Sequence, residues 1–191
     1  LPPRFNRYSG GGTYGFRVDG AVMNLANGEQ LRSDISCTLF LSDPDEYDDD
    51  IILHEIGHWV AFHYSKDDSP GGAHTIIDQA DLRLAHSEGW AHYWSSTVRR
   101  YANTIQGGLY ALPHGFVDNF GVGNSFFEID TPSLDTETVT ARNEIACAHG
   151  VWRLTQTVAG LEDEVWASFK EILAFALPQV SLEDFRARLV V

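Results

Sequence analysis

The pentapeptide His54-Glu55-Ile56-Gly57-His58 is the segment from which the rest of this sequence can be interpreted. On an α-helix, His54 and His58 lie one turn apart on the same face, so both imidazoles can reach one ion. Glu55 lies about 100° round the helix axis from His54, where it can contact a water bound to that ion. Two neutral imidazoles with a carboxylate beside them are typical of a zinc hydrolase.

The residues around the pentapeptide favour a buried helix. Asp48, Asp49 and Asp50 precede it and can cap a helix N-terminus. Apolar side chains follow nearly all round the helix, which should end near Ser65 before a Pro-Gly-Gly segment. The alternative interpretation is a helix with two hydrogen-bonded core histidines and a surface glutamate.

The composition is that of one globular domain. The chain has 191 residues, of which 43% are hydrophobic and 12% aromatic, enough for one well-packed core over residues 1–191. No apolar run is long enough to span a membrane. The formal charge of −14 argues against nucleic acid as a partner, because phosphate binding needs clustered Lys and Arg.

The termini and cysteines say little about cellular location. Leu1 is not an initiator methionine, so we expect a processed form, a proteolytic fragment or an excised piece. Cys37 and Cys147 could form one disulfide, and buried thiols are an equal alternative.

The first quarter of the chain predicts a small, mostly antiparallel sheet. Residues 1–12 have the composition of an irregular segment. Apolar or β-prone runs follow at residues 13–18, 21–25 and 35–41, separated by Asp19-Gly20 and Asn27-Gly28 turn signals. Residues 42–50 form an acidic segment. Calcium binding there is possible, but the segment lacks the motif of a calcium-binding loop.

The rest of the chain predicts helices. One should span residues 78–103, another 137–158, another 162–177, and a short helix should follow Ser181. The Gly-rich, aromatic residues 107–132 predict a loop with one or two short strands. The expected fold class is therefore α+β: a small N-terminal sheet, a metal-binding helix, a glutamate helix and C-terminal helices.

A catalytic zinc needs a third protein ligand, and Glu88 is the best candidate. Gly89 and Ala91 follow it, and their small side chains would let its helix approach the metal helix. His92, His86 and Asp78 remain alternatives. An H-x-x-G-x-x-H extension is excluded because Ala61 and Tyr64 stand where it needs Gly and His.

This combination of motifs resembles the gluzincin metallopeptidases, and more narrowly a group of bacterial gluzincin-like domains. The similarity covers roughly residues 48–153 and includes three segments: Ser69-Pro70-Gly71-Gly72-x-His74, Ser87-Glu88-Gly89-Trp90-Ala91 and Asn143-Glu144-x-x-Cys147. The resemblance implies a zincin-like fold, His54, His58 and Glu88 as zinc ligands, and Glu55 as general base. It also implies a secreted or cell-envelope location.

Other side chains are candidates for contacts with substrate. His92 lies one turn beyond Glu88 and could stabilise an oxyanion, or be a buried histidine bonded to backbone. His74 could face substrate from its loop, or be an exposed histidine. Tyr110 and His114 are further candidates for binding substrate.

The sequence thus predicts a metallopeptidase that binds one Zn²⁺ and cleaves a peptide or protein substrate. Glu55 would take a proton from the metal-bound water and return it to the leaving amine. Two alternatives are a non-catalytic zinc-binding interaction module and a hydrolase of a non-peptide amide or ester.

Overall fold

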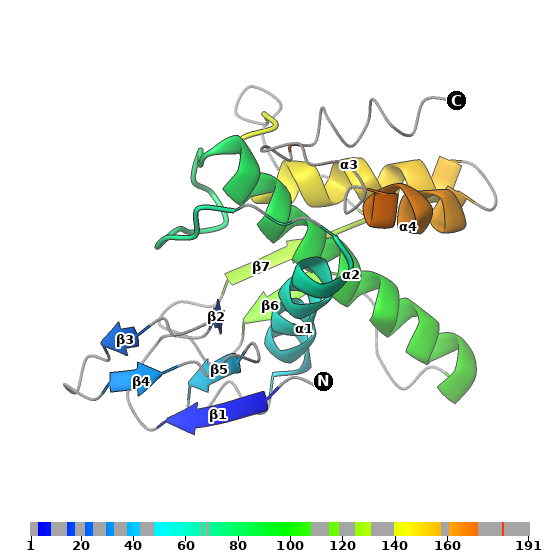
Figure 1. The fold of residues 1–191 in the computed structure, drawn as a ribbon. Helices are drawn as coiled ribbons and strands as arrows, with labels where there is room; N and C mark the ends of the chain where they lie inside the picture. Colours follow the sequence, from blue (N-terminus) through cyan, green and yellow to red (C-terminus); the bar gives the residue numbers. More distant parts are fainter. Residues whose placement is uncertain are drawn as a thin grey trace.

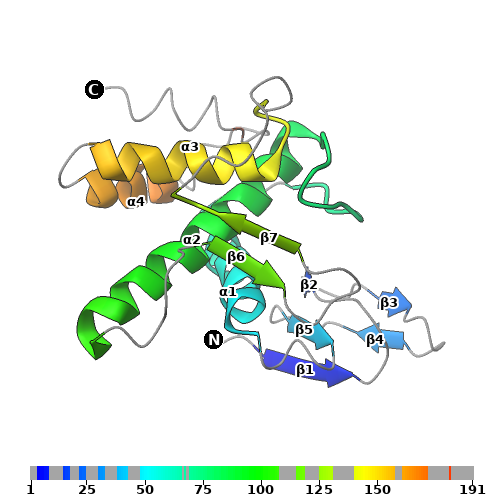
Figure 2. The same ribbon diagram turned by 180° about the vertical axis from the view of Figure 1, so that it is seen from behind.

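The computed structural model describes residues 4–8, 15–17, 22–24, 30–32, 38–42, 48–65, 67, 69–107, 115–118, 125–130, 140–157, 161–171 and 181. Helix α1 spans Asp49–Tyr64, α2 spans Leu82–Gln106, α3 spans Glu144–Thr157 and α4 spans Leu161–Glu171. In Figure 1 the strands of the N-terminal region lie to the left of α1 and below it, while α3 and α4 lie on the opposite side, next to α2. Figure 2 shows the same arrangement from behind.

Helix α1 begins and ends where local chemistry dictates. Asp48 is its N-cap and accepts a hydrogen bond from the backbone N–H of Asp50. Ser65 is its C-cap, as the sequence predicts, and its backbone N–H donates to the carbonyl of Ala61. Asp49 and Asp50 place negative charge in the first turn, where it interacts favourably with the helix dipole.

Helices α1 and α2 pack closely because small residues lie at their contact. A Cβ added to Gly57 of α1 would lie 2.9 Å from the Cα of Ala91. The prediction that Ala91 allows close approach to α1 is therefore confirmed. At one end of the contact between the two helices, Arg99 of α2 donates a hydrogen bond to Asp50 of α1 at 2.6 Å.

Gly89 has a different role from the one predicted. A Cβ at this position would lie 2.4 Å from Cβ of Cys147 and 2.8 Å from the carbonyl oxygen of Glu144. Its missing side chain therefore admits α3, not α1. Cys147 is a buried thiol whose Sγ donates to the carbonyl of Ala141; Cys37 lies outside the described residues.

The hydrophobic core lies where these helices meet. Trp90 of α2 is 2% exposed, and its ring stacks at 22° on that of Trp166 in α4. A hairpin of β6 (Gly115–Asp118) and β7 (Ser125–Glu128) contacts α1 and α2 through β6. The buried core residues are Ile51, Val60, Ala61, Ala85, Trp90, Tyr93, Phe127, Ile129, Ile145, Cys147, Ala148, Val151, Trp152 and Val165.

The N-terminal strands correct two predictions. Strand β1 spans Arg4–Tyr8, where an irregular segment was expected, and it pairs in parallel with β5, Thr38–Ser42. Strand β2, Gly15–Arg17, pairs with β5 in antiparallel fashion, so this sheet is mixed, with the order β1-β5-β2. Strands β3, Val22–Asn24, and β4, Gln30–Arg32, form a separate antiparallel pair.

The predicted helices differ from the observed ones mainly at their ends. Helix α2 begins at Leu82 with Asp81 as N-cap, four residues later than expected, and α3 begins at Glu144, seven residues later. Helix α4 is described as far as Glu171, and the predicted final helix lies outside the described residues. Among the described helices, none is both long and apolar enough to cross a membrane.

Candidate metal centre

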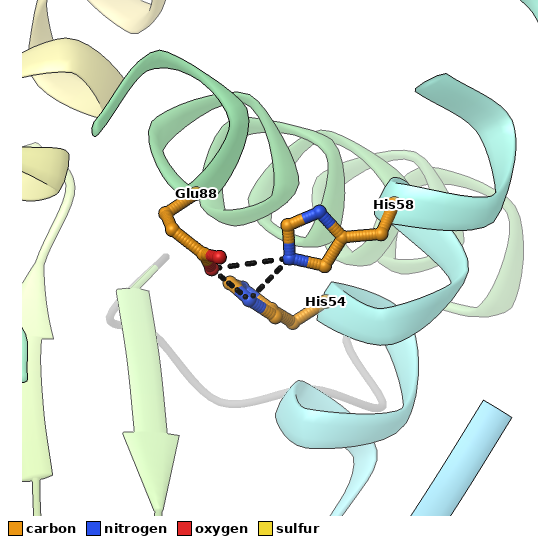
Figure 3. Close-up of side chains that lie close together, drawn as sticks. All are labelled: His54, His58 and Glu88. Atoms are coloured by element: carbon orange, nitrogen blue, oxygen red, sulfur yellow. Dashed lines mark hydrogen bonds and ion pairs between the residues drawn. The ribbon is translucent and has the colours of Figure 1, made fainter. Parts of the chain in front are cut away.

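Three buried side chains from α1 and α2 converge at one point. The Nε2 atoms of His54 and His58 lie 3.0 Å and 3.1 Å from Oε2 of Glu88, and 3.1 Å from each other. Figure 3 shows both imidazoles of α1 directed towards the carboxylate of α2. Each of the three residues is less than 10% exposed. These atoms form a nearly equilateral triangle of two nitrogens and one oxygen.

The size of this triangle fits one metal ion. Ligand atoms about 2.1 Å from an ion are about 3.0 Å apart when they lie at right angles, and about 3.4 Å apart in a tetrahedron. The observed separations of 3.0–3.1 Å are also hydrogen-bond distances in the metal-free protein, and they are close to both values. Three ligands leave one position open in a tetrahedral shell and three in an octahedral one.

A hydrogen-bond relay orients His58. The hydroxyl of Ser87 donates to Oδ2 of Asp67 at 2.7 Å. Because this uses the only hydroxyl proton, Ser87 Oγ acts as acceptor for Nδ1–H of His58, 3.3 Å away. The proton on Nδ1 leaves the Nε2 lone pair of neutral His58 for an ion.

A second relay orients His54. Its Nδ1 lies 3.1 Å from Nδ1 of His92, and Nε2 of His92 lies 3.4 Å from Oε1 of Glu144. If Nε2 of His54 holds an ion, its Nδ1–H donates to His92, which in turn donates to Glu144. In that arrangement His92, which is 2% exposed, would orient His54; its predicted role in stabilising an oxyanion stays a prediction.

Burial and charge set the protonation of the ligands. Burial lowers the pKa of His58, but the charge of Glu88 and its hydrogen bond outweigh this and raise the pKa to about 10. Burial and the neighbouring His92 lower the pKa of His54 to about 3. Burial raises the pKa of Glu88, but the charge of His58 and hydrogen bonds from the histidines hold it well below its ordinary value. In the metal-free protein, one imidazolium and one carboxylate thus occupy the triangle.

The structure brings most of the predicted site residues together. Glu55 is 3% exposed and lies next to His54 on α1. Nε2 of His74 lies 3.5 Å from Oε2 of Glu88. Tyr110 and His114 lie outside the described residues. The alternative ligands His86 and Asp78 belong to neither of the metal-ligating groups formed by described residues.

Three site residues were missed by sequence reasoning: Asp67, Ser87 and Glu144. Asn143 and Glu144 belong to a segment of the family resemblance, but Glu144 is not among the predicted site residues. It is 5% exposed and contacts His74 and His92. A carboxylate directly after a helix-capping asparagine, in a chain with an H-E-x-x-H motif, was the available signal.

Replacing Ser87 by alanine should weaken metal binding about tenfold, because outer partners of a ligand histidine contribute about 10- to 100-fold to affinity. The variant loses the acceptor that holds Nδ1–H of His58, while α2 itself has no reason to unfold. Calorimetric titration with Co²⁺ measures the change. Ser96→Ala, at another buried serine of α2, is the matched control. Equal affinities for the two variants would show that the relay does not orient His58.

Comparison with known proteins identifies hydroxylases, although no family model and no solved structure matches the chain. A PKHD-type hydroxylase of Stenotrophomonas maltophilia is 94% identical over 48 residues, which are 25% of this chain and 21% of the relative. Another, of Burkholderia ambifaria, is 58% identical over 59 residues, 31% of this chain and 26% of the relative. The chain spans between a fifth and about a quarter of the length of these relatives.

These relatives contradict the functional predictions from sequence. They are named hydroxylases, so the assignment to gluzincin metallopeptidases is wrong, and with it the prediction of a protease acting on a peptide or protein substrate. The two alternatives, a zinc-binding interaction module and a hydrolase of a non-peptide amide or ester, are not supported either.

The predicted zinc cofactor is contradicted for a chemical reason. The matching relatives are named hydroxylases, and Zn²⁺, which has no redox chemistry, cannot itself activate O₂ for hydroxylation. The H-E-x-x-H spacing specifies where two imidazoles lie, and this is equally suited to other divalent metals. The zincin-like fold and the secreted or cell-envelope location stay predictions.

Proposed function

We propose that this chain is a metal-dependent hydroxylase whose iron(II) is held by His54, His58 and Glu88. The observation that carries the proposal is the triangle of ligand atoms with sides of 3.0–3.1 Å. Two histidines and one carboxylate with open coordination positions are the ligand set of non-haem iron(II) oxygenases, although zinc enzymes use the same residue types. The names of the relatives point to the same chemistry.

The reaction has a defined balance. One atom of O₂ enters a C–H bond of the substrate, and the other is reduced with two electrons from a co-substrate, such as a 2-oxo acid that loses CO₂. Iron supplies the activation of O₂. The protein supplies a ligand face on which Nε2 of each histidine is held by the hydrogen bond that its Nδ1 makes.

A direct test is the reaction of the full chain with nitric oxide and then with O₂. The iron(II)-loaded protein should bind nitric oxide, an O₂ analogue, and give the half-integer-spin signal of a non-haem iron nitrosyl. Ascorbate and a 2-oxo acid are then added, with the peptides of a tryptic digest as the substrate probe. Reaction with ¹⁸O₂ should give peptides that are heavier by one ¹⁸O atom. Zinc should compete with iron, since it binds such sites more tightly, and suppress both signals.

Absence of a nitrosyl signal in protein that binds iron stoichiometrically would contradict the proposal. So would release of peptide fragments in the presence of zinc, with no incorporation of oxygen under any condition. The matched control is Glu164→Gln, at an exposed position of α4, which should behave like the unmodified protein.

Metal binding should release a proton from His58. Its pKa of about 10 means that the metal-free imidazole is protonated at neutral pH, whereas an ion needs the Nε2 lone pair. His54, with a pKa of about 3, is already neutral. The affinity for the first Co²⁺ should therefore rise about tenfold per pH unit between about pH 7 and 9. Calorimetry in two buffers of different ionisation enthalpy counts the proton; an affinity independent of pH would contradict this assignment.

A further inference from the structure

A second group of potential ligands adjoins the first and shares one residue with it. His74, Glu88 and Glu144 each offer one ligand atom, and these atoms all lie within 4.8 Å of one another. Nε2 of His74 lies 3.5 Å from Oε2 of Glu88 and 3.4 Å from Oε2 of Glu144. Ligand atoms of one ion are about 3.4 Å apart in a tetrahedral shell, so both measured separations fit.

His74 is held in the tautomer that a ligand needs. Its Nδ1 lies 2.9 Å from the carbonyl oxygen of Gly72, which can only accept, so Nδ1 carries the proton. In the neutral imidazole, the Nε2 lone pair then faces two carboxylate oxygens. This arrangement is repulsive unless a cation or a second proton lies between them. A backbone carbonyl on Nδ1 is the usual partner of a metal-ligating histidine.

The charges around Glu88 and Glu144 also favour a cation. Both carboxylates are less than 10% exposed. In the part of the chain that the structure describes, the ion pairs of Glu88 and Glu144 are all with histidines. Buried charge needs a partner, and between these two carboxylates a divalent cation can take the place that the proton on His74 takes in the metal-free protein.

The surrounding structure fixes the two halves of this group relative to each other. Asn143 donates from Nδ2 to the carbonyls of Ile76 and Asp78, and its Oδ1 caps α3 at Ala146. The loop that carries His74 is therefore attached to the turn that presents Glu144. These hydrogen bonds join two of the three segments that form the group, and Glu88 on α2 is the third.

We propose that His74, Glu88 and Glu144 bind a second divalent transition-metal ion, so that Glu88 bridges two ions. The inference concerns metal binding alone, and it does not depend on the reaction that the first ion supports. The two ions would be linked twice: directly through Glu88, and through the chain of His54, His92 and Glu144.

The test counts ions in the full chain with Co²⁺, which is stable in air and visible by its d–d bands. The unmodified protein should bind two equivalents, and the second should reduce the paramagnetic resonance signal of the first through coupling across Glu88. His74→Ala should bind one equivalent, with affinity for the second reduced at least about 100-fold, and show no coupling. Conversely, His58→Ala should lose the first equivalent and keep the second.

The matched control is Ile77→Ala, at a 72% exposed position of the same loop, which should bind two coupled ions. A single equivalent in the unmodified protein would overturn the inference and leave His74 as a protonated partner of the two carboxylates. A second equivalent that survives His74→Ala, or that shows no coupling, would also overturn it. Two coupled ions without oxygen incorporation would retain this inference and refute the proposed hydroxylase.

Discussion

Glu88→Gln should abolish metal binding almost completely, with a loss of affinity of at least about 100-fold. The substitution keeps the size of the side chain but removes the charge on which both triads depend. Oε2 of Glu88 lies within 3.5 Å of Nε2 of three histidines, so no other single atom contacts as many of the proposed ligands. Calorimetric titration with Co²⁺ measures the loss, and Glu164→Gln is the exposed control.

The same variant reports on the electrostatics of the metal-free site. Burial lowers the pKa of His58, and the charge of Glu88 is the largest of the contributions that raise it. Without that charge, the pKa of His58 should fall well below about 10, and the imidazole should become neutral at pH 8. Nuclear magnetic resonance titration of the histidine ring protons measures this change. An unchanged pKa of His58 would show that Glu88 is not its partner in solution.

Gly89→Ala should destabilise the fold by about 3 kcal/mol, at the upper end of the range for overpacking. The new Cβ would lie 2.8 Å from the carbonyl oxygen of Glu144 and 2.9 Å from the backbone N of Ala148. Both neighbours are backbone atoms of α3, so the helix must move as a whole. Urea unfolding followed by circular dichroism measures the free energy of unfolding.

The control for this prediction is Ile105→Ala, at a 62% exposed position of the same helix, which should change stability by less than about 0.5 kcal/mol. Gly89→Ala should also weaken binding of the second ion, because displacement of α3 moves Glu144 away from Glu88. Unchanged stability would mean that α2 and α3 are further apart than the structure shows.

The ligand triangle could be predicted because its determinants are local. Two histidines four residues apart on one helix share a face whatever the fold, and Asp48 marks the start of that helix. Glu88 was the best candidate for the third ligand, and the structure places its Oε2 atom at the third corner of the triangle. Glu144, Ser87 and Asp67 join the site through tertiary contacts, which the spacing in the sequence does not encode.

The identity of the metal and the reaction could not be predicted in the same way. H-E-x-x-H fixes two imidazoles and a nearby carboxylate, and several divalent metals accept such ligands. Strand β1 was missed for a related reason: its neighbours are Pro-rich and Gly-rich segments, and it becomes a strand by pairing with β5, more than thirty residues away. Parallel pairing of this kind has no local signature.

The antiparallel contact of α1 with α2 has a consequence for how this protein can change length over evolution. Arg99 meets Asp50 at one end of the contact, Ala91 meets Gly57 in the middle, and Ser87 meets His58 at the other end. One residue inserted between Ala91 and Arg99 would rotate the two ends of α2 by about 100° relative to each other, so these contacts could not coexist. Insertions and deletions in related sequences should therefore avoid the parts of both helices that lie between these contacts.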